Sequence, residues 1–147
     1  MGQLIIPSGA IVYADTSVFI YTIEEHPDYY DLLQPLWLKF QTEKLELVSS
    51  ELTLLETLVV PLRKADTELV ETYEQLFLMS RMQLLPITRT RLKAAAHLRA
   101  TTKLKTPDAI HAATALSSGC TVFLTNDSQF RTVTVLNTVV LGELLAR

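Results

Sequence analysis

Two aspartates follow runs of apolar residues that read as buried strands. In "IVYADTSVFIY" (11–21) Asp15 comes directly after such a run, and in "TVFLTND" (121–127) Asp127 comes two residues after another. Ligands of open parallel sheets bind outside the carboxyl ends of the strands, so both carboxylates are expected at one edge of a sheet. Each also has a purely structural interpretation. Asp15 could cap a helix that starts at Thr16, and Asp127 could form a local turn.

A third aspartate lies at the predicted start of a helix. In "TPDAIHAATALSSG" Thr106 is the expected N-cap, Pro107 the first helical residue and Gly119 the stop. A negative charge at Asp108 interacts favourably with the helix dipole, which is a sufficient structural explanation. In right-handed βα units, however, such a helix start also lies at the carboxyl edge of the sheet. Asp108 is therefore a candidate for the same site.

The fourth acid, Glu56, interrupts an apolar helix face. In "ELTLLETLVVPLR" apolar residues recur at helical spacing at Leu52, Leu55, Val59 and Leu62. Glu56 falls on or beside this stripe, which we expect to be buried. A buried carboxylate must be paired, protonated or bound to a metal. The alternatives are a side chain that reaches solvent at the edge of the stripe, or a salt bridge to Arg63.

Convergence of these four carboxylates would require a counter-charge. Two unit charges about 4 Å apart repel by about 4 kcal/mol at an effective dielectric constant of about 20. A divalent cation relieves this repulsion without protonating the acids. All-oxygen ligands indicate Mg²⁺ or Mn²⁺, because the three His and the single Cys lack the spacing of a zinc site. Such a site suits hydrolysis of a phosphodiester bond by a metal-activated water.

The remaining pattern alternates short β-branched runs with longer amphipathic ones. It predicts one α/β domain over residues 1–147, with a mostly parallel central sheet of about five strands flanked by helices and a short leader at 1–9. The strands are expected at 10–14, 45–50, 83–87, 121–125 and 133–136. Helices are expected from about Tyr30 through "YDLLQPLWLKF", where Pro35 lies in the first turn or kinks the helix, from Glu51, from Asp66 or Thr67, from Thr88 and from Thr106.

Composition supports a globular protein without covalent cross-links. The chain is 48% hydrophobic and has one cysteine, which leaves no internal disulfide. It shows neither a secretory signal nor an apolar run of 18 residues, so we expect a cytoplasmic protein with no membrane contact. Residues 1–75 hold 13 acidic and four basic residues, whereas residues 76–147 hold three and nine. The basic half suggests a nucleic-acid partner, or it is an ordinary solvated surface.

Four segments in this order resemble the PIN-domain family: "DTSVFIY", "LTLLETLVVPLR", "LKTPDAIHAATAL" and "CTVFLTNDSQF". They look most like the VapC-type ribonuclease toxins of toxin–antitoxin pairs. The resemblance implies a parallel sheet flanked by helices, an Mg²⁺- or Mn²⁺-dependent endoribonuclease, a homodimer and a cognate antitoxin. Asp15, Glu56, Asp108 and Asp127 match the acidic quartet of the family. Thr125, Thr16 and Ser17 match its hydroxyl-bearing positions.

The hypothesis assigns each residue a role in RNA cleavage. Asp15, Asp108 and Asp127 would hold the metal, and Glu56 would order the attacking water. Thr125, Ser17 and Thr16 would hold ligands in place. His111 is either a packed, hydrogen-bonded histidine or a base. Lys103, Lys105, Arg89, Arg91, Lys93 and Arg99 would track the RNA backbone, or they form a solvated helix face.

Other classes of protein remain to be weighed. An aspartyl-nucleophile phosphohydrolase would need a second Asp at position 17, which is Ser, and a receiver domain would need paired acids where Ala14 precedes Asp15. The alternatives left open are a non-catalytic scaffold of this fold and a nuclease of RNA processing that has no antitoxin. We also expect an antitoxin or dimer groove that includes Leu32, Leu36, Trp37, Phe40, Val59 and Leu62, with core burial as the alternative.

Overall fold

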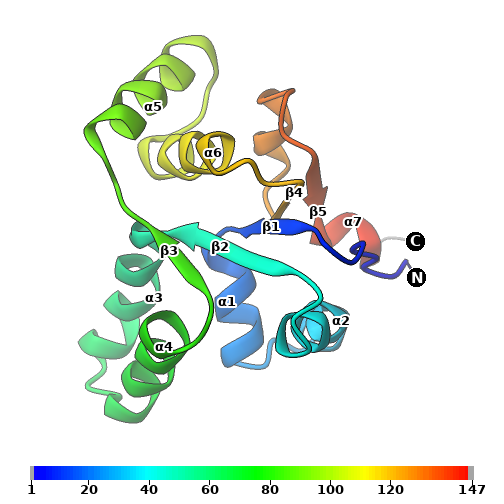
Figure 1. Cartoon of the computed structure of the whole chain (residues 1–147). Coiled ribbons are helices and arrows are strands. Elements are labelled where there is room, and N and C mark those ends of the chain that lie inside the picture. Colours follow the sequence, from blue (N-terminus) through cyan, green and yellow to red (C-terminus); the bar gives the residue numbers. More distant parts are fainter. Residues whose placement is uncertain (1, 146–147) are drawn as a thin grey trace.

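The structure, a computed structural model, describes residues 2–145 and contains a five-stranded sheet between two groups of helices (Figure 1). The strand order is β3-β2-β1-β4-β5, and every neighbouring pair is parallel. The strands are β1 (Ile11–Ala14), β2 (Glu46–Ser50), β3 (Gln83–Leu85), β4 (Val122–Thr125) and β5 (Thr138–Val140). The predicted α/β architecture with a central parallel sheet is confirmed.

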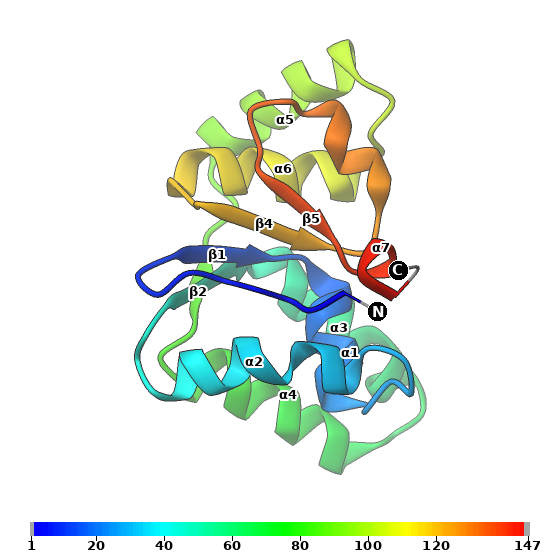
Figure 2. The ribbon, with the colours of Figure 1, turned by 90° about the vertical axis from the view of Figure 1, so that its right-hand side faces the viewer.

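Helices cover both faces of the sheet. As Figures 1 and 2 show, α1 to α4 lie on one face, whereas α6 lies on the other with α5 stacked outside it. The helices are α1 (Thr16–Ile23), α2 (Tyr30–Gln41), α3 (Glu51–Arg63), α4 (Thr67–Met79), α5 (Arg89–Thr101), α6 (Thr106–Ser118), the 3₁₀-helix η1 (Ser128–Thr132) and α7 (Leu141–Leu145). Within residues 2–145, no helix has the length and apolar character needed to cross a bilayer.

Each face of the sheet has its own apolar core. On the side of α1, α2 and α4, the buried side chains include Phe19, Leu33 and Tyr73. On the side of α6 and η1, they include Phe123 and Phe130, whose rings lie 4.7 Å apart. Burial of one such side chain contributes about 1.5–3 kcal/mol. The sheet that carries the candidate acids is therefore held rigidly from both sides.

The leader before β1 is part of the first core. Leu4 and Ile6 are buried, and the carbonyl of Ile6 accepts a hydrogen bond from the ammonium group of Lys39 on α2. The main-chain N–H of Gly2 donates to the carbonyl of Leu144 at 2.8 Å. The segment thus runs along α2 and α7 and closes that side of the domain.

Three predicted features differ from the observed ones. The fifth strand is Thr138–Val140, and the segment 133–136 is a loop, so that prediction is wrong. Thr106 is the first residue of α6, and Lys105 is its N-cap residue, without a side-chain hydrogen bond. Pro35 lies in the interior of α2, because this helix already begins at Tyr30.

Candidate active site at the carboxyl edge of the sheet

Asp15 is held at the carboxyl end of β1 by groups from two elements. It is the N-cap of α1, and its Oδ1 accepts hydrogen bonds from the Ser17 N–H at 3.1 Å and the Ser17 hydroxyl at 2.7 Å. Its Oδ2 accepts a hydrogen bond of 2.5 Å from the hydroxyl of Thr125, the last residue of β4. The capping interpretation is therefore correct, and it coexists with a position at the edge of the sheet.

Burial sets the protonation of Asp15. Its exposure is only 8%, and this desolvation raises the pKa of the carboxyl group above its usual value. Hydrogen bonds from Ser17 and Thr125, and the charge of His111, oppose the rise but do not cancel it. A positive charge beside Asp15 would favour its ionised form and so oppose this rise.

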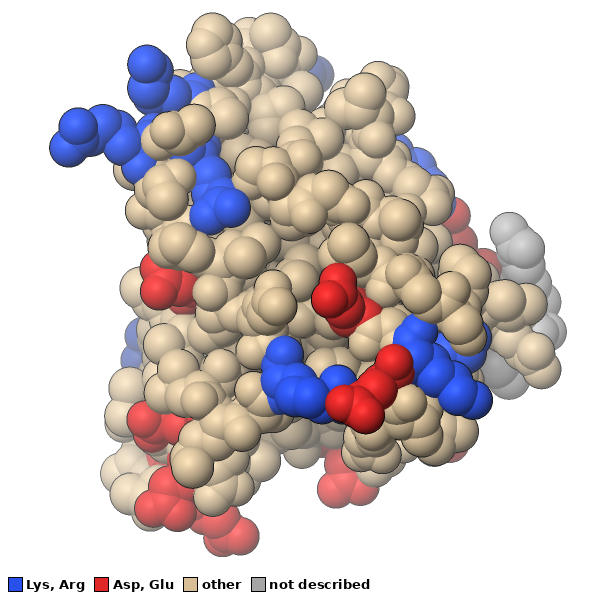
Figure 3. Space-filling view, viewed as in Figure 1, with Lys and Arg blue, Asp and Glu red and all other residues tan. Residues whose placement is uncertain are grey.

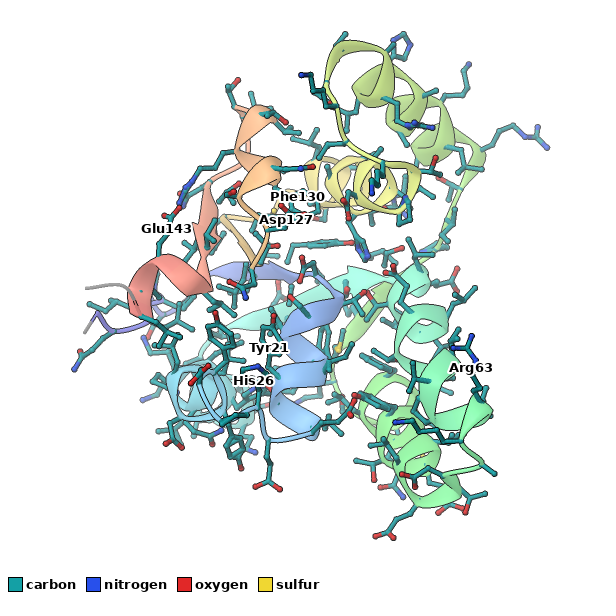
Figure 4. The ribbon with its side chains drawn as sticks, turned by 180° about the vertical axis from the view of Figure 1, so that it is seen from behind. Tyr21, His26, Arg63, Asp127, Phe130 and Glu143 are labelled. Atoms are coloured by element: carbon teal, nitrogen blue, oxygen red, sulfur yellow. The ribbon has the colours of Figure 1, made fainter. Side chains whose placement is uncertain are left out.

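Asp127 is joined to Asp15 through Thr125. The Thr125 hydroxyl, which is completely buried, also accepts a hydrogen bond from the Asp127 N–H at 3.0 Å. Asp127 is the N-cap of η1, and its Oδ1 accepts from the Gln129 N–H at 2.9 Å. Figure 4 shows Asp127 beside Phe130, where η1 leaves the sheet. The predicted local turn is thus present.

Asp108 lies within the electrostatic field of the other three acids. It is half-buried in the first turn of α6. Burial raises the pKa of Asp108, and the negative charges of Asp127, Asp15 and Glu56 raise it further, against an opposing effect of His111. The charges of the other three predicted acids therefore act on Asp108 at this edge of the sheet.

Glu56 reaches this edge from α3 and is paired with a histidine. Its Oε1 accepts hydrogen bonds from the Thr16 hydroxyl at 2.7 Å and from His111 Nε2 at 2.8 Å. Burial by itself would raise the pKa of Glu56, but the hydrogen bonds from His111 and Thr16 and the charge of a protonated His111 outweigh it, so that the pKa is lowered. Glu56 is therefore held as a carboxylate.

The face of α3 that is buried is not the predicted one. Thr53, Thr57 and Pro61 are buried, whereas Leu55 and Leu62 are 60% and 61% exposed. Pro61 and the small threonines allow α3 to lie close against its neighbours. The alternative of a salt bridge from Glu56 to Arg63 is not found, because Glu56 pairs with His111 and Arg63 is exposed at the end of α3, as Figure 4 shows.

The apolar residues expected to form a groove are divided between the core and the surface. Leu36, Trp37 and Phe40 are buried in the first core, and Leu32 is partly buried against it. Core burial is thus the correct interpretation of the apolar face of α2. Val59 and Leu62 remain exposed, by 38% and 61%.

The basic residues fall into two groups. Two arginines make hydrogen bonds within the protein. Arg91 donates to the Pro86 carbonyl and the Ser117 hydroxyl. Arg99 donates to the Leu104 carbonyl and the Thr106 hydroxyl. The other four of the six predicted RNA-binding residues, Arg89, Lys93, Lys103 and Lys105, are exposed and make no such bond within residues 2–145. Figure 3 shows Lys and Arg gathered over α5, and acidic side chains over α3 and α4. On the face drawn in Figure 3 the basic cluster over α5 is thus separate from the acidic side chains over α3 and α4, although other Lys and Arg side chains lie beside acidic ones lower on this face.

The donor chemistry of the edge suits a hard cation. Carboxylate oxygens of Asp15, Asp108 and Asp127 are the available ligands, and Mg²⁺ uses only one or two protein carboxylates directly. Burial raises the pKa of Asp15 and Asp108, and at Asp108 the neighbouring negative charges add to the rise. Within residues 2–145, no three His, Cys, Asp or Glu side chains lie close enough together to hold an ion by themselves. The residues fit a cation that completes its coordination with water or phosphate oxygens.

Two contacts near the candidate acids were not anticipated from the sequence. His111, which is 3% exposed, connects Glu56 to the buried hydroxyl of Tyr13. Asn126, to which no role was assigned, donates to the Tyr21 hydroxyl at 2.9 Å and accepts from the Gly142 N–H at 2.8 Å. One available signal was the position of His111 one helical turn after Asp108, which places both on one side of α6.

Comparison with known proteins agrees with this architecture. The PIN domain family model matches residues 12–136. No curated protein sequence matches the chain. VapBC2 from Rickettsia felis, solved with a DNA fragment from its promoter, has a TM-score of 0.69 at 18% identity over 88% of this chain and 98% of its own.

Two further solved structures have the same fold. VapC20 from Mycobacterium tuberculosis, described as a sarcin-ricin loop cleaving toxin, has a TM-score of 0.70 at 15% identity over 86% of this chain and 97% of its own. A toxin–antitoxin complex from Klebsiella pneumoniae contains a chain with a TM-score of 0.65 at 18% identity, over 88% of this chain and 96% of that one. With a family model that matches most of its length, a parallel sheet in the order 3-2-1-4-5 and an acidic carboxyl edge, the chain belongs to the PIN-domain family.

Proposed function

We propose that this protein is an Mg²⁺- or Mn²⁺-dependent endoribonuclease and the toxin of a toxin–antitoxin pair. The observation that carries the proposal is the position of Asp108, whose pKa is raised by burial and by the charges of Asp127, Asp15 and Glu56. Such convergence costs free energy unless a cation compensates it. In a PIN domain, the reaction that best fits this arrangement is metal-assisted cleavage of a phosphodiester bond.

The proposed roles follow from the positions of the residues. Asp15, Asp108 and Asp127 would hold the cation, which supplies charge neutralisation and a lowered pKa of a bound water. Glu56, ionised and 29% exposed, would accept a hydrogen bond from the attacking water and orient it. Ser17 and Thr125 would fix the carboxylate of Asp15, and the bond from Thr16 would fix that of Glu56.

The RNA backbone would approach over the start of α6. Lys103 and Lys105 are exposed and immediately precede Asp108, so their ammonium groups can neutralise phosphates next to the scissile bond. Arg89 and Lys93 on α5 extend this basic surface. Arg91 and Arg99 are instead used within the fold, and we assign them a supporting role.

The proposed protein partners would use apolar surface that the fold leaves open. Leu55, Val59 and Leu62 form an exposed stripe on α3. This stripe is available for a second copy of the chain in a homodimer or for an antitoxin segment. The similarity to the chain in the Klebsiella pneumoniae toxin–antitoxin complex supports an antitoxin. A gene for a small protein directly next to this one would support it further.

The decisive experiment is metal-dependent cleavage of RNA by the purified protein. We expect single-stranded RNA to be cut with Mg²⁺ or Mn²⁺ and to remain intact with EDTA. Asp108→Asn is the best inactive variant, because Asp15 and Asp127 are also helix caps whereas the N-cap of α6 is Lys105. It should abolish cleavage while the protein still folds, and it should not melt below the wild type because it removes like-charge repulsion. Cleavage that persists in Asp108→Asn would refute the assignment.

One alternative function is favoured by a specific observation. Because no three ligands within residues 2–145 form a ready-made metal cluster, the fold could serve as a binding module without catalysis. Calorimetric titration separates the two. A protein that binds neither Mg²⁺ nor Mn²⁺ and cuts no RNA would be a scaffold.

A further inference from the structure

We propose that His111, clamped by Tyr13, is a positioning residue that holds one oxygen of Glu56 and thereby directs the other into the acidic site. The inference deepens the proposed function, and its catalytic consequence rests on that function. Its structural part stands on hydrogen bonds alone. Four elements contribute: β1 with Tyr13, α1 with Thr16, α3 with Glu56 and α6 with His111.

The imidazole is fixed at both nitrogens. Its Nδ1 lies 2.7 Å from the Tyr13 hydroxyl, and its Nε2 lies 2.8 Å from Glu56 Oε1. Tyr13 is fully buried, and its ring stacks on Phe123 at 5.2 Å with an interplanar angle of 7°. The rings of Tyr13 and His111 meet edge to face at 6.0 Å. The histidine therefore has a rigid support behind it.

This geometry selects the protonation of the nitrogen that faces Glu56. A bare Nε2 at 2.8 Å from a carboxylate oxygen would place two acceptors against each other, which is unfavourable. Nε2 must therefore carry a proton and donate it to Glu56. The Tyr13 hydroxyl, 2.7 Å from Nδ1, can donate its proton to that nitrogen of a neutral ring. The same Nε2–H bond persists if the ring becomes doubly protonated.

The two donors to Glu56 converge on one oxygen. Thr16 and His111 both donate to Oε1, while Oε2 has no hydrogen-bond partner within residues 2–145. The Thr16 hydroxyl also lies 3.3 Å from His111 Nε2. Thr16, His111 and Glu56 are therefore all within hydrogen-bond distance of one another. A carboxylate held in this way cannot rotate freely. Its second oxygen is thus presented in one fixed direction.

An ordinary core histidine would not account for this arrangement. The side of α6 that faces the sheet is otherwise built from small residues, among them Ala109, Ala112 and Ala115. An apolar side chain at position 111 would avoid the cost of burying a polar group, which requires good partners to be offset. Both of the partners that offset it here are polar groups, and one of them is a candidate catalytic acid.

The structural part is tested by NMR of the wild-type protein, without any cleavage assay. Two-bond ¹H–¹⁵N correlation spectra of histidine-labelled protein report which imidazole nitrogen carries the proton. We expect a protonated Nε2 for His111 at neutral pH, with a changed Nδ1 shift in Tyr13→Phe. A neutral ring protonated only at Nδ1, or no response to Tyr13→Phe, would overturn the inference even if the protein cleaves RNA.

The catalytic part is tested by kinetics on a mixed-sequence, labelled single-stranded RNA with Mn²⁺. His111→Leu should lower kcat about 10–100-fold, the usual effect of losing a group that orients an active-site ligand, with KM little changed. His111→Gln, whose amide can still donate to Oε1, should recover most of this loss. His97→Leu is the matched control, because His97 is exposed on α5 and should leave kcat unaffected.

The possible results separate this inference from the proposed function. Wild-type kcat in a folded His111→Leu protein would overturn the positioning role, and so would a folded His111→Gln protein as slow as His111→Leu. If His111→Leu does not fold, the comparison of His111→Gln and Tyr13→Phe with the wild type decides. A wild-type protein that cuts no RNA would refute the proposed function. The NMR result would still show whether His111 donates a hydrogen bond to Glu56.

Discussion

The hydroxyl of Thr125 connects two of the candidate metal ligands, and its removal is a quantitative test of the site. It is completely buried, donates to Asp15 Oδ2 at 2.5 Å and accepts from the Asp127 N–H at 3.0 Å. Thr125→Val keeps the branched shape of the side chain at the end of β4 and removes both bonds. The variant therefore isolates the contribution of a single oxygen atom.

The expected loss of stability can be worked out from these two bonds. A hydrogen bond to an ionised group contributes about 1.5–3 kcal/mol, and one between neutral groups contributes about 0.5–1.5 kcal/mol. We therefore expect Thr125→Val to lower the free energy of unfolding by about 2–4 kcal/mol at neutral pH. The larger part of the loss comes from Asp15, because its carboxylate is left buried with one donor fewer.

The pH dependence of this loss follows from the pKa of Asp15. Burial raises that pKa and Thr125 lowers it, so the variant should have a still higher pKa than the wild type. A carboxyl group whose folded pKa lies above its unfolded pKa destabilises the fold increasingly as pH rises through the folded value. The variant should thus lose most stability where Asp15 is ionised, and its difference from the wild type should shrink on acidification, as Asp15 becomes protonated in both proteins.

Urea denaturation of the metal-free protein at neutral and mildly acidic pH measures both effects. Thr114→Val is the matched control, because Thr114 is equally buried and its hydroxyl donates only to the main-chain carbonyl of Ile110, at 2.7 Å. We expect it to cost about 0.5–1.5 kcal/mol at either pH. The reasoning is refuted if Thr125→Val costs no more than Thr114→Val, or if its cost grows on acidification.

Two further predictions concern the metal and the oligomer. Mn²⁺ should raise the melting temperature more at neutral than at mildly acidic pH, because the raised pKa values of Asp15 and Asp108 let protons compete with the ion; an equal rise at both values would contradict this. The double variant Leu55→Lys, Leu62→Lys should convert a dimer to a monomer in light scattering without lowering the melting temperature, since both side chains are exposed. An unchanged mass would show that this stripe is not the dimer contact.

The sequence was sufficient to predict that Asp15 and Asp127 lie at the carboxyl ends of strands. It was not sufficient to predict the hydrogen bond between Glu56 and His111. Asp15 and Asp127 follow strands whose apolar runs are unmistakable, and parallel pairing brings such strand ends to one edge regardless of detail. The contact between Glu56 and His111 joins residues 55 positions apart in the chain, and helical periodicity says nothing about which helices meet. It became visible only when α3 and α6 were placed in space.

The predictions that were wrong share a physical cause. The segment 133–136 has the β-branched composition of a strand, yet Val133 and Leu136 are buried while Val135 is 80% exposed, a spacing that a loop provides and an alternating strand does not. On α3 the apolar stripe was expected inside, but close packing against other elements favours Thr53 and Thr57 there. In both cases tertiary contacts override the local pattern.

The sheet ends in strands of only three residues on either side, β3 and β5. A short border offers few free main-chain groups to a passing chain, so intermolecular strand addition and fibre growth gain little from it. High concentrations during overproduction should therefore favour association through side chains, as on α3, over ordered stacking of sheets. Protein that precipitates during purification through such contacts should redissolve, and a mild detergent should reduce the precipitation.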